Sequence, residues 1–368
     1  MKQLLIAPAW IGDMVMAHSL VRLLATADPA LELHVVAPAA TVDVATRMDE
    51  VHRTHTLRVG HGQFGLGPRR RLGRSLRAEH FDRAYVLPNS WKSALVPWLA
   101  GVPRRVGWLG ESRWGLLTEA PRLDATAREA LPLMIARFAA LAGYRGEPAD
   151  IPRPRLAVDA DRQQALLREF DLEAGALALC PGAEFGPAKR WPARYYAELA
   201  RRAQASGRQV WLLGGPNDAA VGAEITRRTP GAAVNLIGAT SVLDAIDLLA
   251  AAGHVVCNDS GLMHVACAVG VPVTAVYGST STGFTPPLGA DATAIGLHLA
   301  APSATAISGS DATCATPRCA VDPLPCQPCF ARRCRYGHAD CLALVDVERV
   351  WPTLFAADRT DPKSGSAA

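Results

Sequence analysis

The feature that most constrains the fold is a stretch in which a short apolar run, a polar turn and a longer apolar segment follow one another. It reads HVVCNDSGLMHVACAVGVPVTAVYGSTS and spans residues 254–281. The pattern predicts a strand, a tight turn, a helix and a second strand, which is the βαβ unit of a parallel sheet. The turn at 258–261 would then lie at the carboxyl end of a strand, where open α/β sheets bind ligands and helix starts favour anions. Asp259 and Ser260 are also good N-cap residues, so the turn alone leaves helix capping and ligand binding equally open.

The same alternation recurs on both sides of a central break. Apolar runs at 4–9, 33–38 and 83–88 precede the break, and runs at 176–182, 209–215 and 234–238 follow it. A helix is predicted over 128–142, and the Gly- and Pro-rich stretch 143–156 predicts an interdomain linker. We therefore predict an α/β protein with two Rossmann-like, doubly wound domains facing a cleft, at 1–155 and 156–344. Residues 345–368 would add a C-terminal helix and a disordered tail.

Composition and charge narrow the function classes. The sequence contains no run of 18 apolar residues, so no transmembrane helix is predicted. The N-terminal MKQLLIAPAWIGD is interpreted as a buried strand of a cytoplasmic protein. Residues 1–155 carry a net charge of +7 and the remainder carries −3. An arginine-rich run, 69–77, is either a solvated face or a contact for an acidic partner. Nucleic acid is not favoured as that partner, because no stacking-aromatic module or helix-turn-helix pattern accompanies the run.

Several charged residues stand at predicted strand-to-helix turns. Asp13 follows the first strand and is either an N-cap or a general base at the ligand edge. Lys189 is one of four lysines among 38 basic residues, so a compact point charge can be the reason for its presence. Arg104 and Arg105 lie in a loop-rich, basic stretch, where they are either anion ligands or surface charges. The first turn carries no GxGxxG, so the ordinary dinucleotide fingerprint is absent.

Cysteines concentrate near the C-terminus. Six of the nine lie between 314 and 341, and Cys326 and Cys329 form a CxxC followed by Cys334 and Cys341. A CxxC is the usual half-site for zinc, so a structural zinc on these four thiolates is the favoured interpretation. A metal-free thiol-rich loop and a disulfide framework both remain open. Cys180, Cys257 and Cys267 stand in apolar contexts and are predicted to be buried.

Long ordered motifs carry a resemblance to a known family. The segments CPGAEFGPAKRWP at 180–192 and NDSGLMHVACAVGVPVTAVYGSTSTGFTPP at 258–287 resemble the lipopolysaccharide heptosyltransferases of glycosyltransferase family 9. Segments 7–20, 89–108 and 213–218 are also similar to that family. The resemblance implies a GT-B fold and an inverting glycosyltransferase without a metal-bound DxD site or other required cofactor. It would move L-glycero-D-manno-heptose from ADP-heptose to the first heptose of the lipopolysaccharide inner core, heptosyl-Kdo2-lipid A.

The resemblance also implies roles for individual residues. Asp13 matches the proposed general base, and Lys189 matches the lysine that holds the donor phosphates. Other donor-binding positions are implied at Glu184, Phe185, Thr240, Asp259, Ser260, Gly261 and His264. Lys92, Arg104 and Arg105 are our candidates for binding the anionic acceptor. The lipid acceptor would place the enzyme peripherally at the inner face of the inner membrane, while the sequence indicates no oligomeric state.

Three alternatives remain open from the sequence. One is transfer to Kdo2-lipid A that carries no heptose. The second is a sugar-nucleotide 2-epimerase on the same architecture, which would turn over the donor without an acceptor. The third is a non-catalytic protein that binds a nucleotide sugar or lipopolysaccharide, against which stands the presence of Asp13, Lys189 and Asp259 together.

Overall fold

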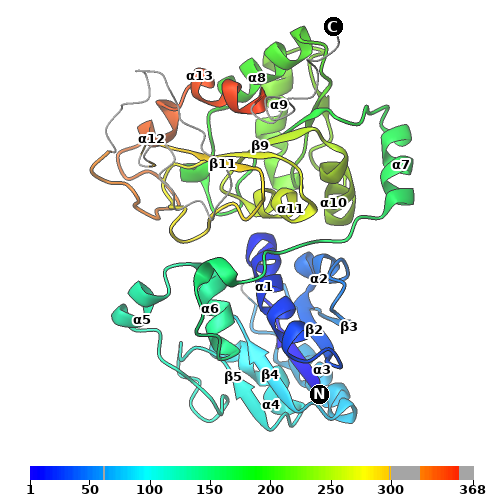
Figure 1. Ribbon diagram of the computed structural model, residues 1–368, viewed down its shortest axis with the longest axis vertical. Coiled ribbons are helices and arrows are strands. Elements are labelled where there is room, and N and C mark those ends of the chain that lie inside the picture. Colours follow the sequence, from blue (N-terminus) through cyan, green and yellow to red (C-terminus); the bar gives the residue numbers. More distant parts are fainter. Residues whose placement is uncertain (61–62, 298, 300–323, 356–368) are drawn as a thin grey trace, which may run out of the picture. The chain divides into compact units, whose positions relative to one another are not determined.

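The chain forms two units of alternating strands and helices in a computed structural model (Figure 1). The structure describes residues 1–60, 63–297, 299 and 324–355. The units comprise Met1–Ala157 and Val158–Ala368, a division two residues beyond the predicted 155/156 boundary. No helix among the described residues is long and apolar enough to span a bilayer.

The first unit is built on a parallel five-stranded sheet in the order β3-β2-β1-β4-β5. Because β2 and β3 extend the sheet on one side of β1 and β4 and β5 on the other, the topological switch point lies between β1 and β4. The strands are β1 (Lys2–Ile6), β2 (Glu32–Pro38), β3 (Arg53–Leu57), β4 (Arg83–Val86) and β5 (Arg104–Val106). The helices are α1 (Ile11–Ala27), α2 (Ala39–Ala45), α3 (Leu66–Ser75), α4 (Leu95–Leu99), α5 (Ala125–Ala130) and α6 (Met134–Leu141).

The second unit has a parallel six-stranded sheet in the order β11-β10-β9-β6-β7-β8. Its switch point lies between β6 and β9. The strands are β6 (Leu177–Cys180), β7 (Val210–Leu212), β8 (Val234–Asn235), β9 (His254–Asn258), β10 (Val273–Val276) and β11 (Ala292–Ile295). The helices are α7 (Ala160–Glu169), α8 (Ala193–Ala205), α9 (Ala219–Arg228), α10 (Val242–Ala251), α11 (Gly261–Val269), α12 (Asp340–Ala343) and α13 (Val347–Val350).

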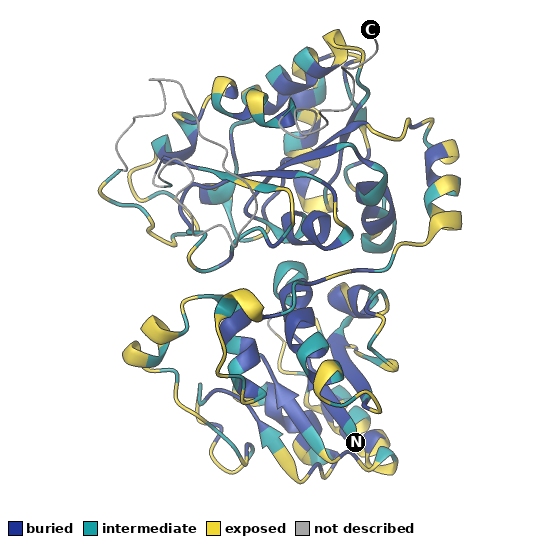
Figure 2. Cartoon of the chain, viewed as in Figure 1, coloured by how far each residue is buried: buried dark blue, intermediate teal, exposed yellow. Residues whose placement is uncertain are grey.

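The central strands of both sheets are buried on both faces, as parallel strands covered by helices are (Figure 2). The segment predicted as a separate C-terminal helix belongs to the second core, because Val345 and Val350 are fully buried there. Its main chain is held as well: the Trp191 indole Nε1 donates to the Val345 carbonyl at 2.7 Å. Residues 356–368, predicted to be a disordered tail, lie outside the described residues.

Two local predictions are wrong. The helix expected over 128–142 is divided into α5 and α6, since Pro132 has no N–H to donate and its ring clashes with the preceding turn. Arg104 and Arg105, expected in a loop, begin the short edge strand β5.

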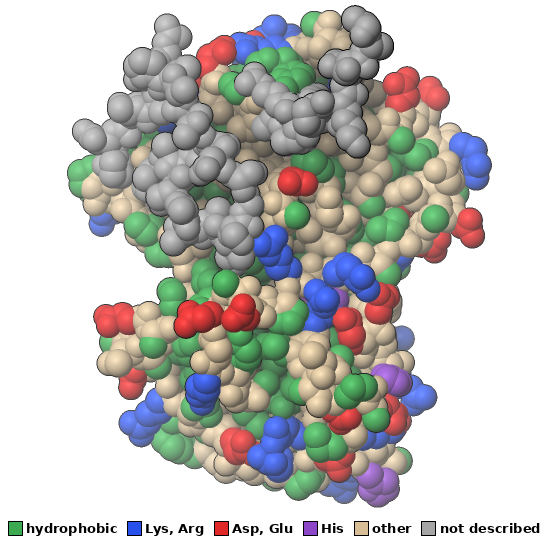
Figure 3. Space-filling model, viewed as in Figure 1, with side chains coloured by type: hydrophobic (Ala, Val, Ile, Leu, Met, Phe, Trp, Pro, Cys, Tyr) green, Lys and Arg blue, Asp and Glu red, His purple; other side chains and the backbone are tan. Residues whose placement is uncertain are grey.

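Figure 3 shows one face of the first unit, where hydrophobic side chains reach the surface beside Lys and Arg side chains.

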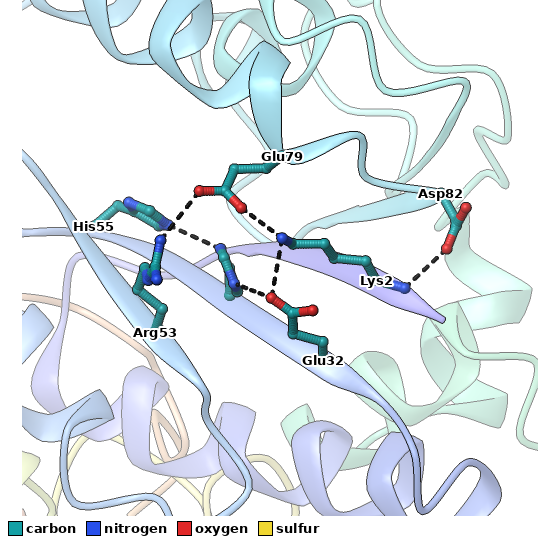
Figure 4. A network of polar contacts seen from close by, with 7 residues as sticks. Lys2, Glu32, Arg53, His55, Glu79 and Asp82 are labelled. Atoms are coloured by element: carbon teal, nitrogen blue, oxygen red, sulfur yellow. Dashed lines mark hydrogen bonds and ion pairs between the residues drawn. The ribbon is translucent and has the colours of Figure 1, made fainter.

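A polar network closes the amino-terminal edge of the first sheet (Figure 4). The Lys2 Nζ lies 3.0 Å from a Glu32 carboxylate oxygen and 2.5 Å from one of Glu79. His34 contacts Glu32 through Nε2 at 3.0 Å and His55 through Nδ1 at 3.1 Å. Burial lowers the pKa of His55 to about 4, so the imidazole is neutral near pH 7. The network neutralises its own charges at the edge opposite to the ligand-binding end of the strands.

Candidate functional site

The candidate donor site lies at the switch point of the second sheet. Strands β6 and β9 pair directly, with Cys180 in register with Cys257. The loop after β6, residues 181–190, and the turn that ends β9, residues 258–261, therefore leave the sheet side by side at its carboxyl edge. Two long sequence motifs far apart in the chain are brought together at this point.

Asn258 joins these two segments. Its side chain is fully buried, and its Oδ1 accepts from the Trp191 backbone N–H at 2.9 Å and from the Tyr196 hydroxyl at 3.0 Å. Its Nδ2 donates to the carbonyls of Pro181 at 2.8 Å and Gly182 at 3.2 Å. The amide thus uses both of its ends to tie the loop after β6 to the end of β9. The sequence motif contains Asn258, but nothing in the pattern indicated this role.

Asp259 and Lys189 form the central charged pair. The Lys189 Nζ lies 2.6 Å from Asp259 Oδ2, and the Thr280 hydroxyl donates to the same oxygen at 2.6 Å. The Asp259 side chain is 3% exposed and that of Lys189 is 13% exposed, so water screens this pair weakly. The Lys189 ammonium also lies 5.0 Å from the centre of the Phe185 ring. Thr280, from the loop after β10, is a member of the site that sequence reasoning missed.

The start of helix α11 has no side-chain cap. Ser260 occupies the N-cap position but its side chain makes no capping hydrogen bond, and the Asp259 carboxylate faces Lys189 instead. Helix capping by these two side chains, one of the two interpretations that the sequence left open, is therefore not observed. The helix begins at Gly261, and the N–H groups of its first turn supply partial positive charge beside the ammonium.

His264 lies one turn into α11 and is 4% exposed. Burial lowers its pKa to about 4, with Asp259 opposing and Lys189 reinforcing that shift, so the ring is neutral near pH 7. Its Nδ1 is buried without a hydrogen-bond partner among the described residues. A buried polar atom of this kind is costly unless a ligand or water satisfies it.

The remaining donor-binding candidates lie on the loops around this pair. Glu184 is exposed, and the Asn217 amide donates to its two oxygens at 3.4 and 3.3 Å. Phe185 is partly buried beneath Lys189. Thr240 follows β8, which β6 and β7 separate from β9, and it immediately precedes Ser241, the N-cap of α10. The structure thus brings Phe185, Lys189 and Asp259 together, while Thr240 stands apart from them in the sheet order.

In the first unit, Asp13 follows the carboxyl end of β1. It is the third residue of α1, whose N-cap is Trp10, so the expected N-cap role does not apply. Lys92 lies in the turn after β4, the neighbouring strand across the switch point, and its Nζ donates to the Gln63 carbonyl at 3.4 Å. Asp13 and Lys92 are therefore both at the edge where such sheets bind ligands.

Arg104 and Arg105 lie differently. Both stand at the amino end of β5, in register with the start of β4. Arg104 forms an ion pair with Glu119 at 2.8 Å, and Arg105 donates to the Leu116 carbonyl at 2.6 Å and the Val102 carbonyl at 2.5 Å. These contacts fix the loop that follows β5, and they place neither arginine at the ligand edge.

Arg113 is a residue that sequence reasoning missed. It is fully buried, and burial lowers its pKa to about 10. Its guanidinium donates to the Pro88 carbonyl at 2.7 Å and to the Trp108 carbonyl. It therefore joins the loops that follow β4 and β5 in the first unit, as Asn258 joins two loops in the second. Nothing in the sequence distinguishes it from the exposed arginines around it.

Four cysteines of the C-terminal cluster line one pocket. Cys326, Cys329, Cys334 and Cys341 share its wall with Ala188 of the loop after β6. All four thiols are free, which disagrees with the disulfide alternative for these residues. Cys314 and Cys319 lie outside the described residues. The other three cysteines, Cys180, Cys257 and Cys267, are buried as predicted.

Comparison with known proteins agrees with this architecture. Residues 69–309 match the model of glycosyltransferase family 9 (heptosyltransferase). Lipopolysaccharide heptosyltransferase 2 of Escherichia coli is 45% identical over 310 residues, which cover 81% of this chain and 88% of that protein. Lipooligosaccharide heptosyltransferase 2 of Haemophilus influenzae is 44% identical over 312 residues, covering 81% and 89% respectively.

A solved structure extends the likeness to nearly the whole chain. The E. coli ADP-heptose lipopolysaccharide heptosyltransferase II matches with a TM-score of 0.80 and 38% identity, covering 97% of this chain and 98% of that one. The predicted GT-B fold with two Rossmann-like domains is confirmed. The family that the sequence motifs indicated is also confirmed: the chain belongs to glycosyltransferase family 9, the heptosyltransferase family.

Proposed function

We propose that this enzyme transfers a heptose from ADP-heptose to the heptose already present on the lipopolysaccharide inner core. The similarity to proteins named heptosyltransferase 2, at 44–45% identity over four-fifths of the chain, carries this proposal. The charged site after β6 and β9 supports this proposal, because the diphosphate group of a nucleotide sugar needs localised positive charge. Transfer to Kdo2-lipid A without heptose and donor epimerisation are the alternatives that the experiment below separates.

The donor diphosphate would bind between Lys189 and the first turn of α11. Both offer positive charge at the same edge of the sheet, and the pair with Asp259 holds the ammonium in place before the donor arrives. As the bond between the anomeric carbon and the phosphate oxygen breaks, Lys189 would offset the charge that develops on departing ADP. Neutral His264 would supply a hydrogen bond to the donor through its unpartnered Nδ1.

The acceptor half of the reaction is assigned to the first unit. Inversion in a single displacement requires the acceptor hydroxyl oxygen to attack the anomeric carbon from the side opposite to ADP. Asp13, at the carboxyl edge of β1, would take the proton from that hydroxyl as the new C–O bond forms. Lys92 lies after the neighbouring strand β4 and would contact the anionic acceptor.

The acceptor itself provides the decisive test of the function. Purified enzyme and ADP-heptose should release ADP rapidly with heptosyl-Kdo2-lipid A and only at background rate with Kdo2-lipid A or with no acceptor. A coupled assay for ADP and mass spectrometry of the lipid product measure the outcome. Release with Kdo2-lipid A alone would instead favour addition of the first heptose. Donor conversion in the absence of any acceptor would favour an epimerase.

Replacing the proposed base tests its role. Asp13→Asn keeps the shape of the side chain but removes its basicity, so kcat should fall by roughly 10²–10⁴-fold. The dissociation constant for ADP should stay within about twofold, because the donor is assigned to the second unit. Steady-state kinetics and calorimetric titration with ADP provide these numbers. Asp43→Asn, on α2 of the same unit, is the matched control, and wild-type turnover by Asp13→Asn would exclude the assignment.

Removing the ammonium tests the donor assignment. Lys189→Ala should reduce kcat by roughly 100-fold and weaken ADP binding, since a preorganised charge at the leaving group is lost. Because the change also leaves buried Asp259 without its cation, the melting temperature must be measured beside the kinetics. Arg201→Ala, an exposed change on α8, controls for loss of a positive charge. If Lys189→Ala kept both its KM for ADP-heptose and its kcat, the phosphate role would be wrong.

We also propose that the first unit meets the membrane surface that presents the acceptor. Phe64, Leu66 and Trp91 are 40%, 52% and 40% exposed, and the Phe64 and Trp91 rings lie 5.0 Å apart. Helix α3 adds exposed basic side chains beside them, at Arg70, Arg71 and Arg74. Aromatic rings at the interface together with arginines near anionic headgroups are typical of peripheral membrane binding. We call these six residues the aromatic–basic patch.

Vesicle binding tests the aromatic–basic patch. The enzyme should co-sediment with vesicles containing phosphatidylglycerol more strongly than with phosphatidylcholine alone. Arg70→Glu, Arg71→Glu and Arg74→Glu together should reduce that binding at least tenfold, at about 1 kcal/mol for each charge near the surface. The matched control changes three exposed arginines elsewhere to Glu, at Arg145, Arg168 and Arg227. Equal loss in both triple variants would show that overall charge, and not this patch, directs the binding.

A further inference from the structure

The cysteine-rich segment, residues 324–343, folds over the donor loop without a core of its own. Among its residues only Cys341 and Leu342 are buried. A chain of this length pays a large conformational entropy when it is ordered, and two buried side chains offset little of it. Small segments of this kind are commonly held by a metal ion, whose binding energy becomes folding energy.

The four thiols of the segment are placed for one ion. Cys326, Cys329, Cys334 and Cys341 follow the spacing C-x2-C-x4-C-x6-C and line a single pocket. Cys341 is buried, Cys326 and Cys334 are partly buried, and Cys329 is exposed. Four thiols around one pocket are the ligand set that a tetrahedral thiophilic ion takes.

The turn around Cys334 is tight. The Gly337 N–H donates to the Cys334 carbonyl at 3.2 Å, and Gly337 and Ala339 adopt left-handed backbone conformations, with φ of 80° and 54°. The turn places Cys334 at the wall of the pocket that the other three thiols also line.

His338, which lines the same pocket, already has partners. His338 Nδ1 accepts from the Asp340 backbone N–H at 3.0 Å and lies 3.2 Å from the Asp340 carboxylate.

In the first unit, Glu32, His34 and Glu79 bring three ligand atoms within 4.8 Å of one another. The Lys2 ammonium, however, lies against both of those carboxylates. Within the described residues the thiols are not gathered that closely, so an ion would draw them inward.

The segment is clamped to the loops of the donor site. The Arg332 Nε donates to the Phe185 carbonyl at 2.9 Å, and the Ala188 N–H donates to the Arg332 carbonyl at 3.2 Å. The Arg332 guanidinium also lies 5.4 Å from the Phe185 ring centre, which Lys189 approaches at 5.0 Å. A second contact runs to the loop after β10, where the Phe330 N–H donates to the Ser279 carbonyl at 2.7 Å. Ordering this segment therefore orders the loop that carries Lys189.

We propose that Cys326, Cys329, Cys334 and Cys341 together bind one thiophilic divalent cation, of which zinc is the type, and that this ion holds the donor loop in place. The ion is structural and takes no part in the transfer. The positioning of the donor loop rests on the proposed function, whereas the binding of the ion does not. The four residues act as metal ligands, and Arg332 acts as the positioning residue that connects them to Phe185 and Lys189.

Metal analysis of the full-length chain tests the first half of the proposal. Elemental analysis of enzyme purified without chelator should give close to one zinc for each chain. A mercurial thiol reagent should release that zinc, and cobalt exchange should give the visible bands of a tetrahedral thiolate site. Cys329→Ser and Cys334→Ser should lose the metal, while Cys267→Ala, a cysteine outside the cluster, should keep it. Absence of stoichiometric zinc or iron from the unmodified chain would overturn the proposal, whether or not the variants fold.

Donor binding tests the second half. Arg332→Ala should retain the metal but weaken ADP binding by about tenfold or more, because the loop that carries Lys189 loses its anchor. Arg333→Ala, the exposed neighbour, is the control. Unchanged ADP binding by Arg332→Ala would refute positioning while leaving the metal site intact. Failure of the wild-type, metal-loaded enzyme to release ADP with any acceptor would instead contradict the proposed function.

Discussion

The buried amide of Asn258 is the interaction on which the candidate donor site depends. It is the last residue of β9, and all four of its contacts reach the loop and helix that follow β6. Each partner left unsatisfied in such a setting costs about 1–3 kcal/mol, so the amide determines how these segments leave the sheet. Asp259 and Lys189 can form their ion pair because the residues beside them are fixed in this way.

The ion pair between Lys189 and Asp259 places a positive charge in a poorly exposed site and gives it a partner there. A site that must bind a diphosphate needs positive charge, but a buried lysine without a partner loses its proton or its position. Asp259 pairs with Lys189 and orients it, and Thr280 keeps Asp259 in place. The uncapped start of α11 then supplies the remaining positive potential without adding a formal charge. Neutral His264 completes a site whose polarity suits an anion and whose net charge stays small.

Strands and site residues could be predicted from the sequence where a local pattern of residues marks them. The central strands are buried on both faces, so each appears as an apolar run, and β1, β2, β4, β6, β7, β9 and β10 could be predicted. The edge strands β3 and β5 read RTHTL and RRV, because half-exposed edges tolerate polar residues, and no such run marks them. Asp259 and Lys189 could be predicted from the motifs that surround them.

Residues that act through contacts with distant parts of the chain could not be predicted from the sequence. Arg113 resembles any other arginine in a basic stretch until the fold buries it against the carbonyls of Pro88 and Trp108. Thr280 stands in a run of small polar residues, and only the pairing of β9 with β10 brings it to Asp259. Pairings of this kind depend on sheet order, which local periodicity does not encode.

The donor loop shows why such a site needs more than one kind of anchor. Residues 181–190 contain only a short 3₁₀ turn at Pro187–Lys189, so within the loop Lys189 is held by one turn, in which its N–H donates to the Gly186 carbonyl at 3.1 Å. Asn258 holds the beginning of the loop from the sheet, and Arg332 holds its middle from the cysteine-rich segment. The first anchor is part of a packed core and is present whenever the second unit is folded. The second anchor is only as rigid as the segment that carries it, and that segment has almost no core. Precision at Lys189 therefore depends on whatever orders residues 324–343, which makes the chemistry of the four thiols a property of the donor site as well as of the fold.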